Sequence, residues 1–156
     1  MATYEGTKTG ASGRFAIVAS RFNESVVDQL VKGAKEGFKR QGVADESVDL
    51  IWVPGSFEVP LVAKRLASSG RYAAVVCLGA VIRGDTDHYE YVAGAAARGV
   101  AEASLSTGVP VIFGILTCAT EEQALERAGG KEGNKGYDAA SAAIEMANLL
   151  RQLPGK

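Results

Sequence analysis

The only histidine of the chain, His88, lies in a polar stretch, residues 84–88, that also holds a glycine, a hydroxyl group and two carboxylates. Imidazole is the one side chain whose unperturbed pKa lies close to neutrality, which makes His88 the first candidate for proton transfer. Its position fits a surface histidine in the first turn of a helix equally well. A functional role therefore depends on which other polar groups the fold places beside it.

Two further clusters, residues 20–23 and 54–58, combine polar and aromatic side chains and each follow a short apolar run. Both precede an expected helix, and the free N–H groups of a helix N-terminus favour an anion or a polar carbonyl. Together with residues 79–88 they form three loops that follow strands. Ligands of open α/β sheets bind at the carboxyl ends of the strands. The three clusters therefore predict a small-molecule site at one edge of a parallel sheet.

Taken singly, several candidates also have ordinary interpretations as core, helix-end or surface residues: Phe22, Glu58, Asp87, Phe113, Arg127 and Lys135. Familiar motifs for nucleotides, phosphate and zinc are absent from the sequence, which has no GxGxxG, no Walker-type glycine loop and no HExxH. One histidine cannot assemble a histidine-rich metal site. We expect neither a metal nor a cofactor.

The elements that must position these residues alternate between strand and helix along the chain. Nearly continuous apolar runs, typical of strands buried on both faces, predict strands at residues 14–20, 48–53, 73–79 and 111–116. Helical spacing of apolar residues predicts helices at residues 23–41, 57–69, 87–107, 120–129 and 134–153. This alternation implies a parallel sheet covered on both faces, in a single domain over residues 1–156 with a loose N-terminal arm at 1–12.

Three patterns predict where helices begin. Asn23 is a preferred N-cap residue, and Asp87 with Glu90 has the spacing of a capping-box variant. Thr120 with Gln123 has the spacing of a true capping box. We expect a side-chain cap at each of these three helix starts.

Composition and charge exclude several classes of protein. The 156 residues carry 17 basic and 18 acidic side chains, a net charge of −1, which argues against a nucleic-acid-binding surface. No apolar run approaches the roughly 20 residues of a membrane helix, and the N-terminus does not resemble a signal peptide. Cys77 and Cys118 adjoin apolar runs without a CxxC pair, which predicts buried reduced thiols. A cytoplasmic protein that binds neither membrane nor nucleic acid is expected.

Taken together, the segments around these candidates resemble the lumazine synthase family of riboflavin biosynthesis. The resemblance extends from about residue 14 to residue 150, with matching segments at 21–23, 53–60, 79–91, 109–116, 122–136 and 141–149. It implies a flavodoxin-like fold, a three-layer α/β sandwich around a central four-stranded parallel sheet. It also implies a transferase that condenses 5-amino-6-(D-ribitylamino)uracil with 3,4-dihydroxy-2-butanone 4-phosphate. The product would be 6,7-dimethyl-8-ribityllumazine, with release of phosphate and water.

The resemblance assigns the pyrimidine substrate to the first two clusters. Phe22 would stack on the pyrimidine ring, and the backbone of Ser56 and Phe57 would hydrogen-bond that ring at a helix N-terminus. Glu58 would bind the ribityl hydroxyl groups. Two apolar residues would line the same pocket, Val81 and Ile82.

The third cluster would bind the phosphate and move protons. Asp85 and Thr86 would hold the phosphate through backbone N–H groups and the threonine hydroxyl, and His88 would be the general acid/base. Asp85 departs from the small neutral residue that is more usual in the family. A carboxylate beside a phosphate is unfavourable unless it points away, so we expect only the backbone N–H group of Asp85 to contribute.

Three more residues, Phe113, Arg127 and Lys135, resemble those that a neighbouring subunit adds to the same pocket. Arg127 would pair with the phosphate bidentately, and Lys135 would contact the pyrimidine. The family forms rings of five subunits, and in some members twelve rings close into an icosahedral shell of sixty. The compact segment 129–136 resembles the shell-forming type, and the arm around residues 4–6 resembles one that adds an edge strand to a neighbour's sheet. Riboflavin synthase is a candidate partner inside such a shell.

Two other classes of protein fit parts of the pattern. A flavodoxin-like module that binds a flavin or lumazine without turnover would explain Phe22 but leaves His88 and Arg127 without a task. A shell protein that has lost catalysis would have lost site residues, whereas these are in place. The sequence favours the enzyme, and release of phosphate distinguishes it from both alternatives.

Overall fold

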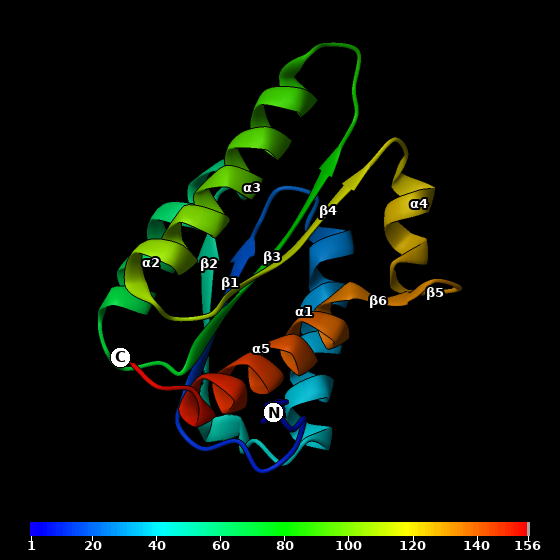
Figure 1. Ribbon diagram of the computed structural model, residues 1–156. Coiled ribbons are helices and arrows are strands. Elements are labelled where there is room, and N and C mark those ends of the chain that lie inside the picture. The colour runs from blue at the N-terminus through cyan, green and yellow to red at the C-terminus, as the bar shows by residue number, and fades with distance from the viewer. Residues whose placement is uncertain (156) are drawn as a thin grey trace.

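The computed structural model describes residues 1–155 and shows a four-stranded parallel sheet between two layers of helices (Figure 1). The strands are β1 (Phe15–Ser20), β2 (Val48–Val53), β3 (Ala74–Ile82) and β4 (Val111–Cys118). They lie in the order β2-β1-β3-β4, so that β2 and β4 form the edges. The two central strands are almost entirely buried, as their continuous apolar runs predict. The predicted α/β three-layer sandwich is confirmed.

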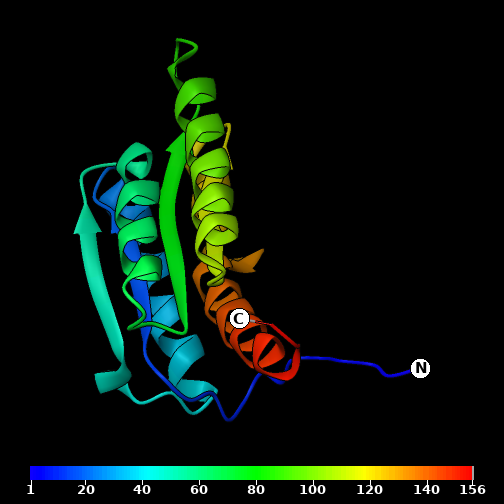
Figure 2. The ribbon, with the colours of Figure 1, turned by 60° about the vertical axis from the view of Figure 1, so that its left-hand side comes forward.

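Two pairs of helices cover the two faces of the sheet (Figures 1 and 2). One face packs against α1 (Glu24–Arg40) and α5 (Lys135–Gln152), and the other against α2 (Val59–Ser68) and α3 (His88–Thr107). Each face has its own core of aliphatic side chains. The helical spacing of apolar residues in the sequence therefore reports which side of each helix meets the sheet.

Both strands of the β3–β4 pair run further than predicted. Their parallel register continues to Ile82 opposite Cys118, past the predicted ends at residues 79 and 116. Residues 81 and 82 are therefore the last two residues of β3, at the carboxyl ends of the strands. The polar loop begins only after them.

The region after β4 also differs from the prediction. The helix α4 (Glu121–Glu126) is shorter than expected, and a hairpin of β5 (Ala128–Gly130) and β6 (Gly133–Asn134) follows it. Gly129 and Gly133 have φ values of 111° and 83°, which glycine adopts readily and other residues rarely do. In the sequence Gly129 predicts the end of a helix, whereas in the structure both glycines belong to a tight hairpin.

The three helices begin where predicted, after Asn23, Asp87 and Thr120, but only one of the three expected side-chain caps forms. Thr120 Oγ1 accepts a hydrogen bond from the N–H group of Gln123 at 3.2 Å. Asn23 instead has a left-handed backbone with φ 62° and donates from Nδ2 to the carbonyl oxygen of Ala80 at 2.9 Å. Within residues 1–155, the side chain of Asp87 accepts no capping hydrogen bond. Asparagine tolerates the left-handed conformation, so the loop geometry determines its role here.

The segment predicted as a loose N-terminal arm, residues 1–12, contains no helix or strand, and side chains of α5 hydrogen-bond to its backbone from residue 5 onward. The Nδ2 atom of Asn148 in α5 donates to the carbonyl oxygen of Thr7 at 2.9 Å. One turn later, Gln152 Nε2 donates to the carbonyl oxygen of Glu5 at 2.7 Å. Residues 1–4 extend away from α5 (Figure 2).

A polar cluster joins the edge strand β2 to its neighbours. The carboxylate of Asp49 accepts hydrogen bonds from the Tyr72 hydroxyl at 2.6 Å and from Arg14 Nη2 at 2.8 Å. The hydrogen bond from Tyr72, followed by that from Arg14, lowers the pKa of Asp49, and the same bond raises the pKa of Tyr72. The cluster therefore contributes to stability as long as Asp49 is ionised.

Both cysteines are free and buried, Cys77 in β3 and Cys118 in β4, as predicted. Burial raises the pKa of the Cys77 thiol to about 12, so the thiol stays protonated and unreactive near neutrality. Among residues 1–155, none of the helices combines the length and the apolar character that crossing a bilayer requires.

Candidate functional site

The loops after β1, β2 and β3 meet at the carboxyl ends of these strands, as the sequence predicts. The N–H group of Phe22 donates to the carbonyl oxygen of Pro54 at 3.0 Å, which continues the β1–β2 pairing beyond the strands. The hydrogen bond from Asn23 to Ala80 ties the same loop to β3. These contacts bring the three polar clusters together.

The three loops enclose a cavity of about 730 Å³ at this edge of the sheet, which we call the strand-end cavity. Eight of the predicted site residues line it: Phe22, Ser56, Phe57, Glu58, Val81, Ile82, Thr86 and His88. Asp85 lies in the same loop, exposed to solvent, between the lining residues Gly84 and Thr86.

The walls of the strand-end cavity are suited to a planar ring with hydroxyl groups. Phe22 and Phe57 are 63% and 60% exposed, so two aromatic side chains are available for stacking. The half-buried carboxylate of Glu58 is a hydrogen-bond acceptor for hydroxyl groups. Among the described residues that line the cavity, none is a lysine or an arginine. The residues that line this pocket therefore suit a ring but include no cation to neutralise a phosphate; the arginine of the same loop, Arg83, holds its guanidinium 5.2 Å from the centre of the Tyr89 ring.

A short 3₁₀ turn, η2 (Ser56–Glu58), presents Phe57 and Glu58 to the cavity. This turn lies directly against the sheet at Gly79 of β3. A Cβ atom at Gly79 would lie 2.5 Å from Ser56 Oγ and 2.8 Å from Ser20 Oγ. Both distances are too short for a real side chain, so the glycine is what allows η2 to sit this close to the strand ends.

The first turns of α3 form another wall of the strand-end cavity. His88 is the first residue of α3, and its N–H group donates to Thr86 Oγ1 at 3.3 Å. Tyr91 and Val92 line the cavity on the same side of the helix. We did not predict these two residues, although their spacing of three and four from His88 places them on its face of a helix.

The remaining three predicted residues, Phe113, Arg127 and Lys135, line a second cavity of about 400 Å³. It lies against the edge strand β4, so we call it the β4 cavity. Two carboxylates that we did not predict, Glu132 and Asp138, line it as well. The two cavities share no described lining residue. Within one chain, these three residues therefore stay apart from the strand-end cavity.

Arg127 is the cation best suited to bind an anion in the β4 cavity. Its Nη1 atom donates to the carbonyl oxygen of Gln123 at 3.0 Å and lies 3.7 Å from Glu126 Oε2, an exposed pair that is worth little. Burial raises the pKa of the nearby Cys118 thiol, and the positive charge of Arg127 opposes that rise. A guanidinium held in this way can offer its planar fork to a phosphate or a carboxylate.

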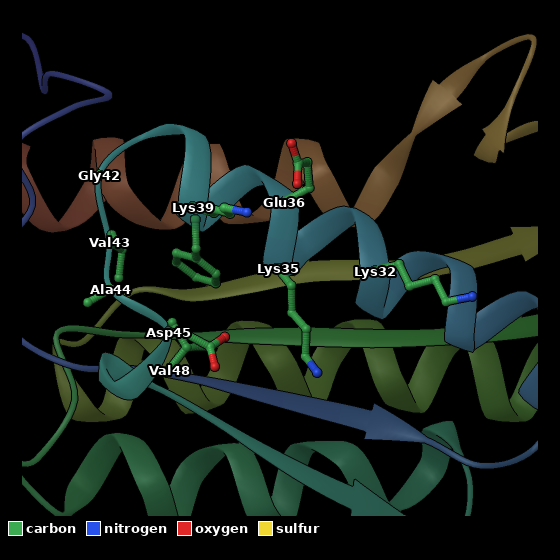
Figure 3. A pocket seen from close by; sticks show the side chains of 10 residues that line it. Lys32, Lys35, Glu36, Lys39, Gly42, Val43, Ala44, Asp45 and Val48 are labelled. Atoms are coloured by element: carbon green, nitrogen blue, oxygen red, sulfur yellow. The ribbon is translucent and has the colours of Figure 1, made fainter.

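A third cavity, of about 560 Å³, lies between α1 and the segment that leads into β2 (Figure 3). Lysines 32, 35 and 39 line it, together with Val48 at the amino end of β2. It contains none of the predicted site residues and lies at the opposite end of β2 from η2. Among residues 1–155, no three histidine, cysteine, aspartate or glutamate side chains gather closely enough to hold a metal ion.

The family model for 6,7-dimethyl-8-ribityllumazine synthase matches residues 12–151 of the chain. The match contains all four strands of the sheet and every residue that lines the strand-end and β4 cavities. It leaves out only residues 1–11 of the N-terminal arm and the segment from residue 152, the last residue of α5, onward. The chain belongs to the 6,7-dimethyl-8-ribityllumazine synthase family.

Proposed function

We propose that the active site is shared between neighbouring copies of this chain, with the strand-end cavity of one copy completed by the β4 cavity of the next. The family catalyses the condensation of 5-amino-6-(D-ribitylamino)uracil with 3,4-dihydroxy-2-butanone 4-phosphate, and this chain is a transferase of that kind. One observation carries the proposal. Among the described residues, the pocket suited to the pyrimidine has no lysine or arginine, whereas Arg127 and Lys135 line the separate cavity on β4.

The pyrimidine substrate binds in the strand-end cavity. Phe22 stacks on the ring, and backbone groups of Ser56 and Phe57 hydrogen-bond its edge at the start of η2. Glu58 accepts hydrogen bonds from the ribityl hydroxyls. The exposure of Phe22 and the half-buried carboxylate of Glu58 support these roles. Two apolar residues at the end of β3, Val81 and Ile82, form the cavity floor.

The phosphate of the second substrate binds where two chains meet. Thr86 contributes its hydroxyl group and Asp85 its backbone N–H group from one chain, and Arg127 of the next chain pairs with the phosphate bidentately. Lys135 and Phe113 from that chain close over the pyrimidine. Because a phosphate dianion is poorly bound without a cation, a site without Arg127 would bind this substrate weakly.

His88 moves protons between the two substrates. The amine of the pyrimidine attacks the ketone, water leaves as the imine forms, the phosphate is eliminated, and a second ring closes with loss of water. Each step needs a proton donated or removed, which an imidazole at the edge of the cavity can do. Because an amine and a ketone are already reactive, holding them together supplies much of the acceleration.

The outer faces of α2 and α3 support an oligomer. Leu61 on α2 is 73% exposed and Leu105 on α3 is 87% exposed, and neighbouring copies would cover such side chains. The assembly that we propose is a ring of five chains, each a single domain, with twelve rings in a shell of sixty. The tight turn between β5 and β6 supports the shell, and the position of β2 at the edge of the sheet supports strand addition by the arm around residues 4–6 of a neighbour. Sedimentation at a mass near five chains would contradict the shell.

The cellular setting that fits this reaction is the cytoplasm, with riboflavin synthase as a candidate guest inside the shell. Co-sedimentation of added riboflavin synthase with the assembled protein after joint refolding tests that partner.

The test of the catalytic proposal is to supply both substrates and follow lumazine absorbance together with phosphate release. Product and phosphate should appear together, above the rate without protein. Binding of the ribityl pyrimidine without phosphate release would instead support one of the two alternatives, a binding module without turnover or a shell protein that has lost catalysis.

A further inference from the structure

Asn134 connects three elements of the structure. It ends β6, caps α5 and contacts α1. Its Oδ1 atom accepts hydrogen bonds from the N–H groups of Gly136 and Tyr137 at 2.8 and 3.1 Å, and its Nδ2 atom donates to the carbonyl oxygen of Gln29 at 3.0 Å. Because N–H groups must donate and a carbonyl must accept, these three partners fix the orientation of the amide.

Two glycines allow this contact. A Cβ atom at Gly33, in the middle of α1, would lie 2.1 Å from Asn134 Oδ1. A Cβ atom at Gly136 would lie 2.0 Å from the carbonyl oxygen of Leu30. Glycine inside a helix lowers its stability, and the close approach of the Asn134 amide gives a reason for glycine at position 33.

The same residue determines where two cations lie. Lys135 follows Asn134 directly, and its N–H group donates to the carbonyl oxygen of Arg127 at 2.8 Å. Across the hairpin, Asn134 pairs with Ala128, the residue after Arg127. Figure 1 shows the β5–β6 hairpin between α4 and the start of α5, beside α1. A displacement of Asn134 therefore moves Arg127 and Lys135 together.

The other support of Arg127 comes from α4, which is only six residues long. The Arg127 guanidinium donates to the carbonyl oxygen of Gln123 and pairs with the half-buried Glu126, and the Arg127 backbone N–H group donates to the carbonyl oxygen of Ala124 at 3.1 Å. The contact of Asn134 with α1 ties the hairpin to a second long helix, in addition to α5, into which β6 continues directly.

We infer that Asn134 is a positioning residue, which holds the β5–β6 hairpin against α1 and so sets where Arg127 and Lys135 meet the substrates. It acts through these two residues and does not itself touch substrate. The inference rests on the proposed role of Arg127 and Lys135 in binding.

Two variants disturb this contact in different ways. Asn134→Asp keeps an acceptor for the cap of α5 but places a carboxylate oxygen against the carbonyl oxygen of Gln29. Gly33→Ala keeps asparagine at position 134, but the new methyl group pushes the side-chain amide of Asn134 away from α1. The matched control is Gln41→Ala, because Gln41 Nε2 donates to Ser141 Oγ and so links the same two helices at the C-terminal end of α1, more than three turns from Gln29.

Steady-state kinetics of the assembled full-length protein should separate positioning from general stability. In both variants we expect the KM for the phosphate-bearing substrate to rise roughly tenfold or more, with kcat changed less than about threefold. Hydrogen exchange of the amides of residues 127–135 should become faster in both. Gln41→Ala should lower the melting temperature without changing KM or the exchange of these amides. If either Asn134→Asp or Gly33→Ala fails to assemble, the kinetics and amide exchange of the other variant test the inference.

Several results would overturn the inference. An unchanged KM in the folded variants would do so, and so would an equal rise in KM in Gln41→Ala, which would assign the effect to helix packing in general. Absence of turnover in the unaltered protein contradicts the proposed function instead. Amide exchange then decides alone: faster exchange at residues 127–135 in the two variants supports the role of Asn134, and unchanged protection overturns it.

Discussion

Gly79 offers a sharp test of how closely the site geometry depends on packing. In Gly79→Ala, the new methyl group would lie 2.5 Å from Ser56 Oγ, against an ordinary contact of 3.4–4 Å, so Ser56 Oγ must move by about 1 Å. Ser20 Oγ lies 2.8 Å from the same point, so two buried serine side chains would have to turn away together, and we expect the Ser56 backbone to shift instead. Ser56 begins η2, so its movement displaces Phe57 and Glu58 as well.

We expect Gly79→Ala to lower kcat/KM by roughly 10- to 100-fold, because a shift of about 1 Å in a positioning group has effects of that size. Overpacking should also lower the free energy of unfolding by about 1–3 kcal/mol. Steady-state kinetics with both substrates and denaturant unfolding measure the two effects. Adding Ser56→Ala removes the nearest oxygen and should restore part of the activity. If Gly79→Ala retains the kcat/KM of the unaltered protein, the reasoning from this contact is refuted.

Three further predictions concern single side chains. His88→Ala should lower kcat/KM by only about 10–100-fold, because water can relay protons in place of the imidazole. Arg127→Ala should lower kcat/KM further, because it removes the cation that binds the phosphate. Steady-state kinetics in which His88→Ala loses more kcat/KM than Arg127→Ala would contradict these roles. Asp85→Ala should bind the phosphate-bearing substrate no more weakly than the unaltered protein, and a substantially higher KM would show that its carboxylate matters. Tyr72→Phe should destabilise the protein by an amount that is full above about pH 4 and shrinks as the pH falls, because the lowered pKa of Asp49 stabilises the folded state only while the carboxylate is ionised. Urea unfolding across a pH series measures this difference, and a difference independent of pH would contradict the assignment.

The sheet and its two layers could be predicted because their sequence signals are long and regular. The apolar runs of β1 and β3 and the helical spacing in α1 leave few alternatives. The β5–β6 hairpin could not, since Gly129 and Gly133 are as typical of a helix end as of a turn. Local hydrogen-bonding patterns were a weaker guide still. Asn23 has the residue type of a cap, but its side chain instead bonds to β3, a partner far away in the sequence.

The strand-end cavity could largely be predicted because the carboxyl ends of parallel strands lie at one edge of the sheet. The role of Gly79 could not, since it depends on two serine oxygens that converge on it from other elements. The residue types and sequence positions of Arg127 and Lys135 also do not predict a place at the strand-end cavity. In the structure they line the separate cavity on β4, and that separation is what supports the proposed sharing of the site between chains.

Subunit mixing tests the shared site most directly. His88→Ala chains and Arg127→Ala chains would be unfolded together, refolded at equal amounts and assayed for lumazine formation, with each variant refolded alone as control. If neighbouring chains share the site, random mixing pairs an intact His88 with an intact Arg127 at about a quarter of the interfaces. The mixture should then recover about a quarter of the activity of the unaltered protein, well above either variant alone. Activity equal to the mean of the two separate variants would contradict a site shared between subunits.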